Sequence, residues 1–582
     1  MMKISIKYWL GTLFIILSLS IVSEVAVSAD KITINGVEGP LEENIRQHLT
    51  LTERDCMASE WRLQAARSDA AGEITQALQA LGYYDATIKS GELQHNEECW
   101  SISFDITPGK PVRINQIHVD FEQDAANDNK FKELRDELPV TKGEILNHDN
   151  YTRTKEAIQI LALERGYFDA EFSRHQLLVD PEYHNADIQL TMVSGSRYRF
   201  GNVSIKSDFL EQHLLDRLVT ITPGELYSSE KVYEFQQALN DSGYFDSAAI
   251  RERHDKQQRI VHLDVTLTPN KKYAIGFGVG VTTDGGPRVS ANLQDRYVNR
   301  HGHRYKSSIR YEALLGVSLD FLYSIPLENP TKEWFSFMAQ IETVETDTSK
   351  RNTARLGVRM TKLRPNDWLE TRYLTLKYEQ YDVAQESGRA MPLIPGISWT
   401  RTRKDSDHRI LKGDKLHLEL RGAVHDFSDG SPFFQAIARG KWINSPWEKG
   451  RIISRLDVGF TVVDDINNMA VSDRFFTGGD NSIRGYGYQD LGPENSLGYV
   501  TGGKHLAVAS LEYEHFLKKG WSVAAFVDTG NAFNDDALDV KTGVGVGVRW
   551  LSPLGPIKID LAHPLDDEQN DIRFVFRMGA EF

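Results

Sequence analysis

The sequence predicts three repeated α+β units followed by a transmembrane antiparallel β-barrel of about 16 strands. Three observations lead to this fold class. A Gly-aromatic-aromatic phrase recurs at domain spacing, helical periodicity disappears near residue 268, and the remaining sequence alternates apolar and polar residues. The 582 residues are enough for several domains of ordinary size.

Composition excludes two broad classes of protein. Hydrophobic residues make up 40% of the chain, and no series of apolar stretches of about 20 residues is present, which excludes a helical multispan membrane protein. A barrel remains compatible, because only alternate residues of each strand face lipid. The formal net charge of -15 gives no basic footprint, so no nucleic-acid partner is expected.

Residues 1–29 have the pattern of a signal peptide. Lys3 and Lys7 precede an apolar run over Leu10–Val22, and small residues at Val27, Ser28 and Ala29 match the positions that a signal peptidase recognises. We expect cleavage after Ala29 and export of the rest. An uncleaved anchor is less favoured, because no stop-transfer pattern follows.

Cys56 and Cys99 are the two cysteines of the sequence. In an exported protein they are expected to pair with each other rather than to react or to bind a metal. Such a disulfide contributes about 3–4 kcal/mol to the stability of its small unit on the chain-entropy account.

The repeated phrase occurs at Leu81–Ala86, Arg165–Ala170 and Ser242–Ser247. A helical pattern precedes each copy, most clearly over Tyr151–Glu164, where Asn147 or Asp149 is the expected N-cap. The glycine of each copy is expected to end its helix in the left-handed conformation, which glycine adopts at little cost.

Strand-like segments accompany these helices at Trp100–Ile106, Arg113–Val119, Arg197–Ile205 and Ile260–Leu267. We therefore divide the region into units at 30–108, 109–194 and 195–268. The units resemble POTRA domains, the polypeptide-transport-associated modules of the periplasm; unrelated α+β modules are the alternative. The resemblance implies open sheet edges, to which a partner or substrate chain can add a strand.

Residues 269–582 are predicted to form the barrel. Leu416, Leu418 and Leu420 alternate with polar residues, and similar alternation recurs up to the last residue, Phe582. At about 20 residues per strand and loop, this length gives roughly 16 strands. A terminal aromatic residue resembles the sorting signal of bacterial outer-membrane barrels. We therefore expect a location in the outer membrane of a Gram-negative bacterium, with the repeats in the periplasm.

Three segments of the barrel region resemble motifs of the BamA-type outer-membrane assembly superfamily: Asp473–Tyr486, Phe526–Asn531 and Trp550–Lys558. The first is similar to a long loop of that superfamily with an Arg-Gly-Tyr tip, here Arg484, Gly485 and Tyr486. The resemblance implies that the loop folds into the lumen and that Arg484 binds an acidic residue of the wall. Asp528 is the best candidate and Glu514 the second. The alternative is that Arg484 lies in water at a hairpin tip.

A barrel must also pair its first strand, near Tyr273–Val281, with its last, near Ile572–Phe582, because each unsatisfied backbone group in lipid costs several kcal/mol. Glycines weaken strand preference and ease bending. They occupy Gly276, Gly278 and Gly280 in the first strand and Gly579 in the last. We hypothesise that this seam, which includes Phe582, opens laterally.

Three POTRA-like units, two cysteines in the first unit and this length are most similar to TamA-type members of the superfamily. The resemblance implies a TamB-like partner that is anchored in the inner membrane, spans the periplasm and is bound by the first unit. It also implies a role in inserting or secreting outer-membrane proteins such as autotransporters. A two-partner-secretion-type polypeptide transporter and a passive outer-membrane channel are the alternatives.

An enzyme is not expected. The sequence has no Gly-x-Ser-x-Gly nucleophile elbow, and His301 and His303 lack a third metal ligand nearby in the sequence. The Gly-x-Gly runs at Gly276 and Gly543 do not continue as nucleotide fingerprints. We therefore assign no catalytic, cofactor-binding or metal-binding residue.

Overall fold

The computed structural model describes residues 31–579 apart from short internal segments at 96–98, 347–348, 384–385, 407–408, 429, 519, 536–537, 554 and 568–570. The predicted signal peptide and Phe582 lie outside the described residues. The chain divides into two compact units, Met1–Tyr198 and Arg199–Phe582. Within the described residues, no helix has the length and apolarity needed to cross a membrane.

The first repeat packs two helices on a small sheet. Its elements are β1 (Ile32–Asn35), α1 (Pro40–His48), α2 (Glu60–Ala80), β2 (Thr87–Ser90), β3 (Gln94–His95) and β4 (Trp100–Thr107), with a 3-10 turn at Thr50–Glu53. The sheet order is β1-β4-β2, and β3 pairs with β4. The buried face of α2, including Leu63 and Ile74, packs with Trp100 and Phe104 in one core.

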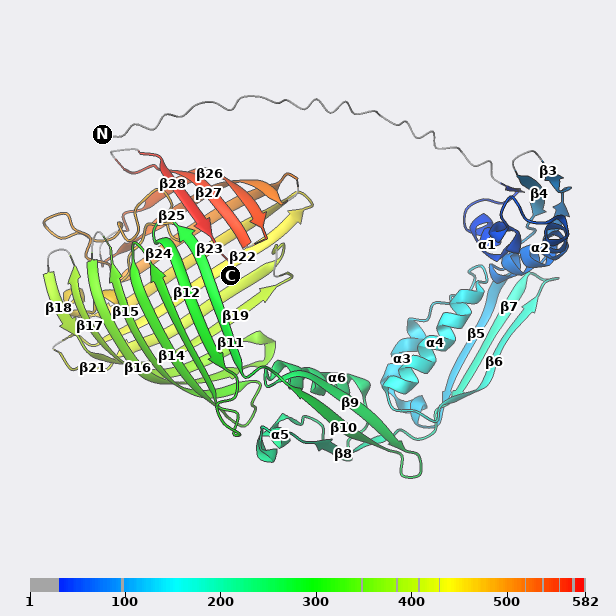
Figure 1. The fold of residues 1–582 in the computed structure, drawn as a ribbon, viewed down its shortest axis with the longest axis horizontal. Coiled ribbons are helices and arrows are strands. Elements are labelled where there is room, and N and C mark those ends of the chain that lie inside the picture. Colours follow the sequence, from blue (N-terminus) through cyan, green and yellow to red (C-terminus); the bar gives the residue numbers. More distant parts are fainter. Residues whose placement is uncertain are drawn as a thin grey trace, which may run out of the picture. The chain divides into compact units, whose positions relative to one another are not determined.

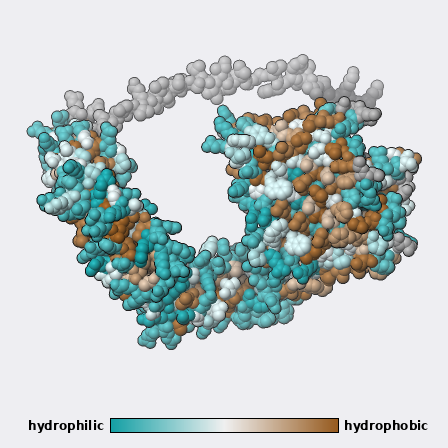
Figure 2. Space-filling model, turned by 180° about the vertical axis from the view of Figure 1, so that it is seen from behind, coloured by the Kyte–Doolittle hydropathy of each residue, from teal (hydrophilic) through white to brown (hydrophobic). Residues whose placement is uncertain are grey.

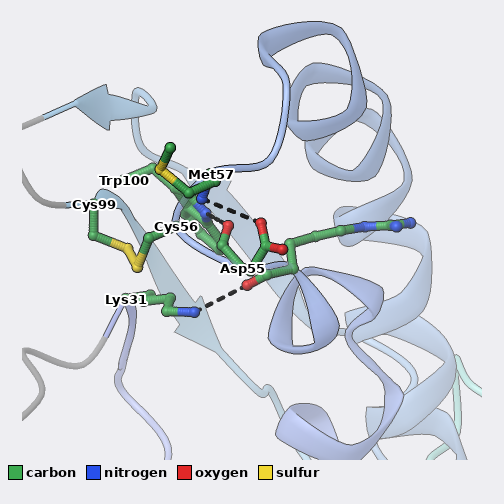
Figure 3. Close-up of a disulfide and its surroundings, with 7 residues drawn as sticks. Lys31, Asp55, Cys56, Met57, Cys99 and Trp100 are labelled. Atoms are coloured by element: carbon green, nitrogen blue, oxygen red, sulfur yellow. Dashed lines mark hydrogen bonds between the residues drawn. A yellow bond between two sulfur atoms is a disulfide. The ribbon is translucent and has the colours of Figure 1, made fainter.

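The predicted disulfide between Cys56 and Cys99 is present (Figure 3). It joins the loop before α2 to the start of β4. The Trp100 indole N–H donates to the Asp55 carbonyl at 2.9 Å, and Lys31 Nζ donates to the Arg54 carbonyl at 3.0 Å. The covalent link therefore lies within a group of hydrogen bonds that hold the same loop.

The second repeat comprises β5 (Arg113–Glu122), α3 (Asn129–Asp136), α4 (His148–Glu164), β6 (Glu171–Asp180) and β7 (Asn185–Val193), with a 3-10 turn at Gln123–Asn127. Its sheet order is β5-β7-β6. The Asn147 side chain caps α4 by accepting from the Asp149 N–H at 2.8 Å, as one of the two predicted caps. Gly166, just beyond the helix, has a φ of 84°, which confirms the predicted left-handed stop.

The third repeat comprises β8 (Arg199–Ile205), α5 (Gln212–Leu218), α6 (Ser229–Asp241), β9 (Phe245–Asp255) and β10 (Ile260–Pro269), in the sheet order β8-β10-β9. It contacts the turn between the second and third barrel strands. The Tyr244 hydroxyl donates to the Gly302 carbonyl at 2.7 Å, and the Arg304 guanidinium lies over the rings of both Tyr244 and Trp334. His301 Nδ1 lies 2.5 Å from Glu211 Oε1, so this histidine has a partner from the repeat.

The barrel strands run in chain order around the wall (Figure 1). Their bounds are β11 (Tyr273–Thr282), β12 (Gly286–Asp295), β13 (Arg304–Glu312), β14 (Gly316–Pro326), β15 (Glu333–Glu345), β16 (Ser349–Leu363), β17 (Leu369–Val383), β18 (Glu386–Ala390), β19 (Pro392–Lys404), β20 (Gly413–Ala423), β21 (His425–Asp426), β22 (Phe433–Trp447), β23 (Gly450–Val463), β24 (His505–Phe516), β25 (Trp521–Phe533), β26 (Lys541–Ser552), β27 (Gly555–Pro564) and β28 (Arg573–Met578). The short β18 and β21 only supplement the direct pairs β17–β19 and β20–β22. The described residues therefore form the predicted wall of 16 antiparallel strands.

Alternation along the strands separates the two faces of the wall. Apolar side chains such as Ile341 and Leu356 are exposed on the outside, and Figure 2 shows apolar residues gathered over that surface. Polar side chains such as Lys377, Glu379 and Asp528 are buried on the inside. This is the arrangement expected for a barrel whose outer face meets lipid.

Candidate functional site: a luminal charge lock and a short seam

A 41-residue connection, residues 464–504, joins β23 to β24 and folds into the lumen. Its side chains Phe475, Ile483, Tyr486 and Leu491 form a buried apolar cluster with residues of the inner wall. The wall contributes Ile437 from β22, Leu506 and Val508 from β24, and Ala532 from β25. The loop is therefore held against the strands by packing as well as by polar contacts.

The predicted pair of Arg484 and Asp528 comes together inside the barrel. Arg484 Nε lies 2.6 Å from Asp528 Oδ2, and Arg484 Nη2 lies 3.0 Å from Oδ1. The backbone N–H of Arg484 also donates to Asp528 at 3.2 Å. Arg484 is 3% exposed and Asp528 is fully buried. The two-pronged contact fixes the orientation of the arginine as well as its charge.

Two further carboxylates complete the lock. Arg484 Nη1 lies 2.7 Å from Glu512 Oε2 and 3.3 Å from Asp560 Oδ2. Arg549 bridges the same two carboxylates and lies 2.9 Å from Glu512, while the Arg484 guanidinium lies over the Phe526 ring. Three acidic groups and two arginines thus share one buried network, which we call the lock (Arg484, Glu512, Asp528, Arg549, Asp560).

Glu514, the second candidate, contacts a different arginine. Its Oε2 lies 2.7 Å from Arg451 Nη2, and both side chains are buried. Glu512 and Glu514 project from the same face of β24 but lie about 7 Å apart along the strand. The sequence therefore predicted the correct face of β24, but not that Glu512 on that face is the residue that contacts Arg484. Glu512 and Asp560 were not predicted, although alternation from Glu514 and within β27 places both on the inner face.

Glycines let the loop approach the wall. Gly485 has a φ of 104°, and a Cβ there would lie 3.1 Å from the Pro564 nitrogen. A Cβ at Gly543, on β26, would overlap the Arg484 carbonyl oxygen. The Tyr486 hydroxyl, at the end of the motif, donates to the Thr542 carbonyl at 3.4 Å. Glycine on each side of the contact therefore lets the backbone of the Arg-Gly-Tyr tip come close to β26 and β27.

The seam between β11 and β28 is much sparser. Thr282 and Arg577 form the one residue pair between these strands in the described part of the chain. Just above it, the Thr283 N–H donates to the Phe576 carbonyl at 3.0 Å, and the Phe576 N–H donates to Thr283 Oγ1 at 2.6 Å. In β11, residues Tyr273–Val281 have no ladder partner among the described residues on this side.

The predicted seam glycines lie on the inner face of β11. A Cβ at Gly276, Gly278 or Gly280 would meet the side chains of Asn292, Ser290 and Arg288, respectively, from β12. The outward residues Ile275, Phe277 and Val279 are 66%, 82% and 73% exposed. Gly579 follows β28 as a bend. The first strand therefore presents apolar side chains outward and, on its inner face, glycines that are covered by side chains of β12.

The fold and this site define an outer-membrane β-barrel with periplasmic POTRA domains. The Omp85 superfamily domain matches residues 286–582, slightly more than half of the chain, so the chain belongs to the Omp85 superfamily. A POTRA domain described as TamA domain 1 matches residues 31–108, and a POTRA domain described as a surface antigen variable number repeat matches residues 117–192 and 198–270. The barrel lies in the outer membrane and the POTRA domains in the periplasm.

Individual relatives agree with this assignment. The chain is 23% identical over 586 residues to the outer membrane protein assembly factor BamA of Nitratidesulfovibrio vulgaris, covering 95% of this chain and 73% of the relative. It is 22% identical over 588 residues to BamA of Neisseria meningitidis serogroup B, covering 88% and 72%. The crystal structure of BamA from Haemophilus ducreyi lacking POTRA domains 1-3 has a TM-score of 0.67 at 16% identity, covering 80% of this chain and 99% of that one; this likeness concerns the fold.

Proposed function

We propose that this protein assists the insertion of outer-membrane proteins by opening the seam between β11 and β28. The observation that carries the proposal is the single residue pair that joins these strands in the described part of the chain. Every other neighbouring pair of wall strands shares a longer ladder, for example ten residue pairs between β11 and β12. Among the described residues, the wall therefore has its fewest backbone pairs at the seam, where we propose that a new strand enters.

Backbone hydrogen bonding explains why such an edge binds polypeptide. Along β11, the N–H and C=O groups that have no ladder partner among the described residues cannot be satisfied by lipid, and each unsatisfied group costs several kcal/mol in hydrocarbon. An incoming β-strand satisfies them through main-chain bonds that depend little on its sequence. A substrate strand can thus begin its own barrel by pairing with β11.

We further propose a TamA-type role, in which the first POTRA domain binds a TamB-like protein that spans the periplasm and the clients include autotransporters. Three POTRA units and the match of residues 31–108 to TamA domain 1 support this role. The first repeat offers β1 and β2 as the edges of its path β1-β4-β2. Crosslinking in cells from the exposed residues of β2 tests it: adducts with a periplasm-spanning partner support it, and their absence contradicts it.

A disulfide across the seam tests the main proposal. If the register of the Thr282–Arg577 pair is extended by one residue, Val281 lies opposite Met578, and strand alternation turns both side chains outward. In the variant V281C/M578C, oxidation is expected to abolish assembly of newly made outer-membrane proteins, and reduction to restore it. The matched control I557C/M578C shares one cysteine but links β27 to β28 at a rung that is already paired. Full activity of the oxidised V281C/M578C variant would contradict seam opening.

A further inference from the structure

The luminal loop touches the first hairpin of the barrel at a second place, distinct from the lock. Asp284 lies in the turn 283–285 that joins β11 to β12. Its Oδ2 accepts the Asp480 N–H at 2.6 Å, and Asp480 Oδ2 accepts the Asp284 N–H at 3.1 Å. The carboxylate of each aspartate thus accepts the backbone N–H of the other, and Asp480 is 2% exposed.

The last strand joins the same point. Arg573 Nη2, on β28, lies 3.3 Å from Asp284 Oδ1 and supplies a positive charge to a pair of carboxylates that would otherwise repel each other. Arg577 Nη1 donates to Asn481 Oδ1 at 3.4 Å, and its Nη2 lies 3.4 Å from Asp560 of the lock. The loop therefore binds both sides of the seam, beside the Thr282–Arg577 pair.

These contacts are weaker than those of the lock. Asp480 Oδ1 is buried and has no hydrogen-bond partner among the described residues, so part of its desolvation cost stays uncompensated. The Arg573 contact is a single long one, and the Arg573 side chain is 31% exposed. The lock is different, because Arg484 alone contacts three carboxylates there.

We propose that Asp284, Asp480 and Arg573 form a seam clasp through which the luminal loop senses and controls the seam. This inference rests on the proposed function, in that the seam is the place where substrate enters. A strand that pairs with β28 or separates it from β11 withdraws Arg573 from Asp284 and Arg577 from Asn481. The loop then loses its hold on the first hairpin, four residues before Arg484, and the change reaches the lock through the Arg577–Asp560 contact. Seam opening and loop release are one event.

Distances across the seam test the clasp directly. Spin labels on V279C and F574C, both outward-facing and exposed, report the separation of β11 from β28 in the full chain in lipid nanodiscs. The native cysteines are joined to each other and do not react with the label. We expect D480A or D284A to raise the fraction of molecules with a widened seam at least threefold. In the D284A/D480A double variant, this fraction should be no larger than in either single variant, because both substitutions remove the same contact.

Two further variants keep the test decisive. E494A removes an exposed carboxylate of the same loop outside the clasp and should leave the distances unchanged. If D480A does not fold, R573Q removes the charged contact from the strand side and should widen the seam as well. An unchanged distance distribution in the folded clasp variants, or additive effects of D284A and D480A, would overturn the inference.

The outcomes separate this inference from the proposed function. If the clasp variants widen the seam but the oxidised V281C/M578C variant still assembles substrates, the clasp stands and seam-mediated insertion fails. If the oxidised variant is inactive but the clasp variants leave the seam unchanged, seam-mediated insertion stands and the clasp fails.

Discussion

The lock joins the luminal loop to the wall, and the seam joins β11 to β28, with very different numbers of contacts. In the lock, Arg484 is bound by three buried carboxylates, and Arg549 bridges two of them. At the seam, two strands share one residue pair in the described part of the chain. The comparison indicates that the loop is held much more firmly at the lock than at the seam, and that the seam is the part that can move.

The largest expected effect comes from breaking the lock. R484A leaves Asp528, Glu512 and Asp560 buried without their shared cation, and breaking a buried ion pair in this way costs about 3–5 kcal/mol. R484K keeps the charge but not the planar guanidinium, so its stability should lie between those of R484A and the wild type. To measure the effect, samples are incubated at increasing temperatures before electrophoresis, and the loss of the compact, fast-migrating form is followed on gels. R372A, on an exposed side chain of the wall, is the control and should not shift the transition.

Two glycine substitutions compare the regions with the same chemical change. G543A places a methyl group on the Arg484 carbonyl, which cannot move aside, and should cost about 1–3 kcal/mol. G278A meets only the Ser290 side chain at 2.6 Å, which can rotate, and should be neutral or strengthen β11 by about 0.5–1 kcal/mol. Thermal unfolding in detergent compares the two. Equal destabilisation would remove the distinction between a fixed lock and an adaptable seam.

A smaller change sharpens the account of the seam. T283V removes the hydroxyl that accepts the Phe576 N–H and should weaken the closed seam by about 1 kcal/mol. Amide hydrogen exchange at Phe576 should accelerate about fivefold, while exchange within β25 stays the same. T283S retains the hydroxyl and should behave as wild type. Unchanged protection of Phe576 in T283V would show that other contacts hold this rung.

The smallest expected effect lies in the periplasmic repeats and depends on pH. Burial raises the pKa of Asp128, but the hydrogen bonds from Arg165 at 3.0 and 3.1 Å outweigh it and lower the pKa below its ordinary value. The carboxylate therefore stabilises the start of α3 at neutral pH, and this contribution is lost as the pH falls below the unfolded pKa of about 4 and through the lowered folded one. Exchange of the α3 amides should rise over that range and stay flat in D128N.

The sequence predicted the repeats, the barrel and the Arg484–Asp528 contact because each depends on a local pattern. The helix stop at Gly166 follows from one residue's conformational freedom, and the alternation that defines the wall repeats every two residues. The choice of Glu512 over Glu514 depends on strand register, which a two-residue period does not determine. The Thr282–Arg577 pair of the seam depends on the register of β28 against β11, and the need for glycine at Gly543 depends on a loop some 60 residues earlier in the chain. Neither is a local property.

The three glycines on the inner face of β11 have a consequence for which clients this protein can accept. Because side chains of β12 cover those glycines, the first strand carries no luminal side chain of its own at these positions that could reject a newcomer. If substrates enter at the seam as proposed, an incoming strand is selected by its extended backbone, its main-chain N–H and C=O groups and the apolar side chains that it turns toward the lipid. We therefore expect such a seam to accept many unrelated sequences, because it would recognise the conformation of the backbone rather than particular side chains.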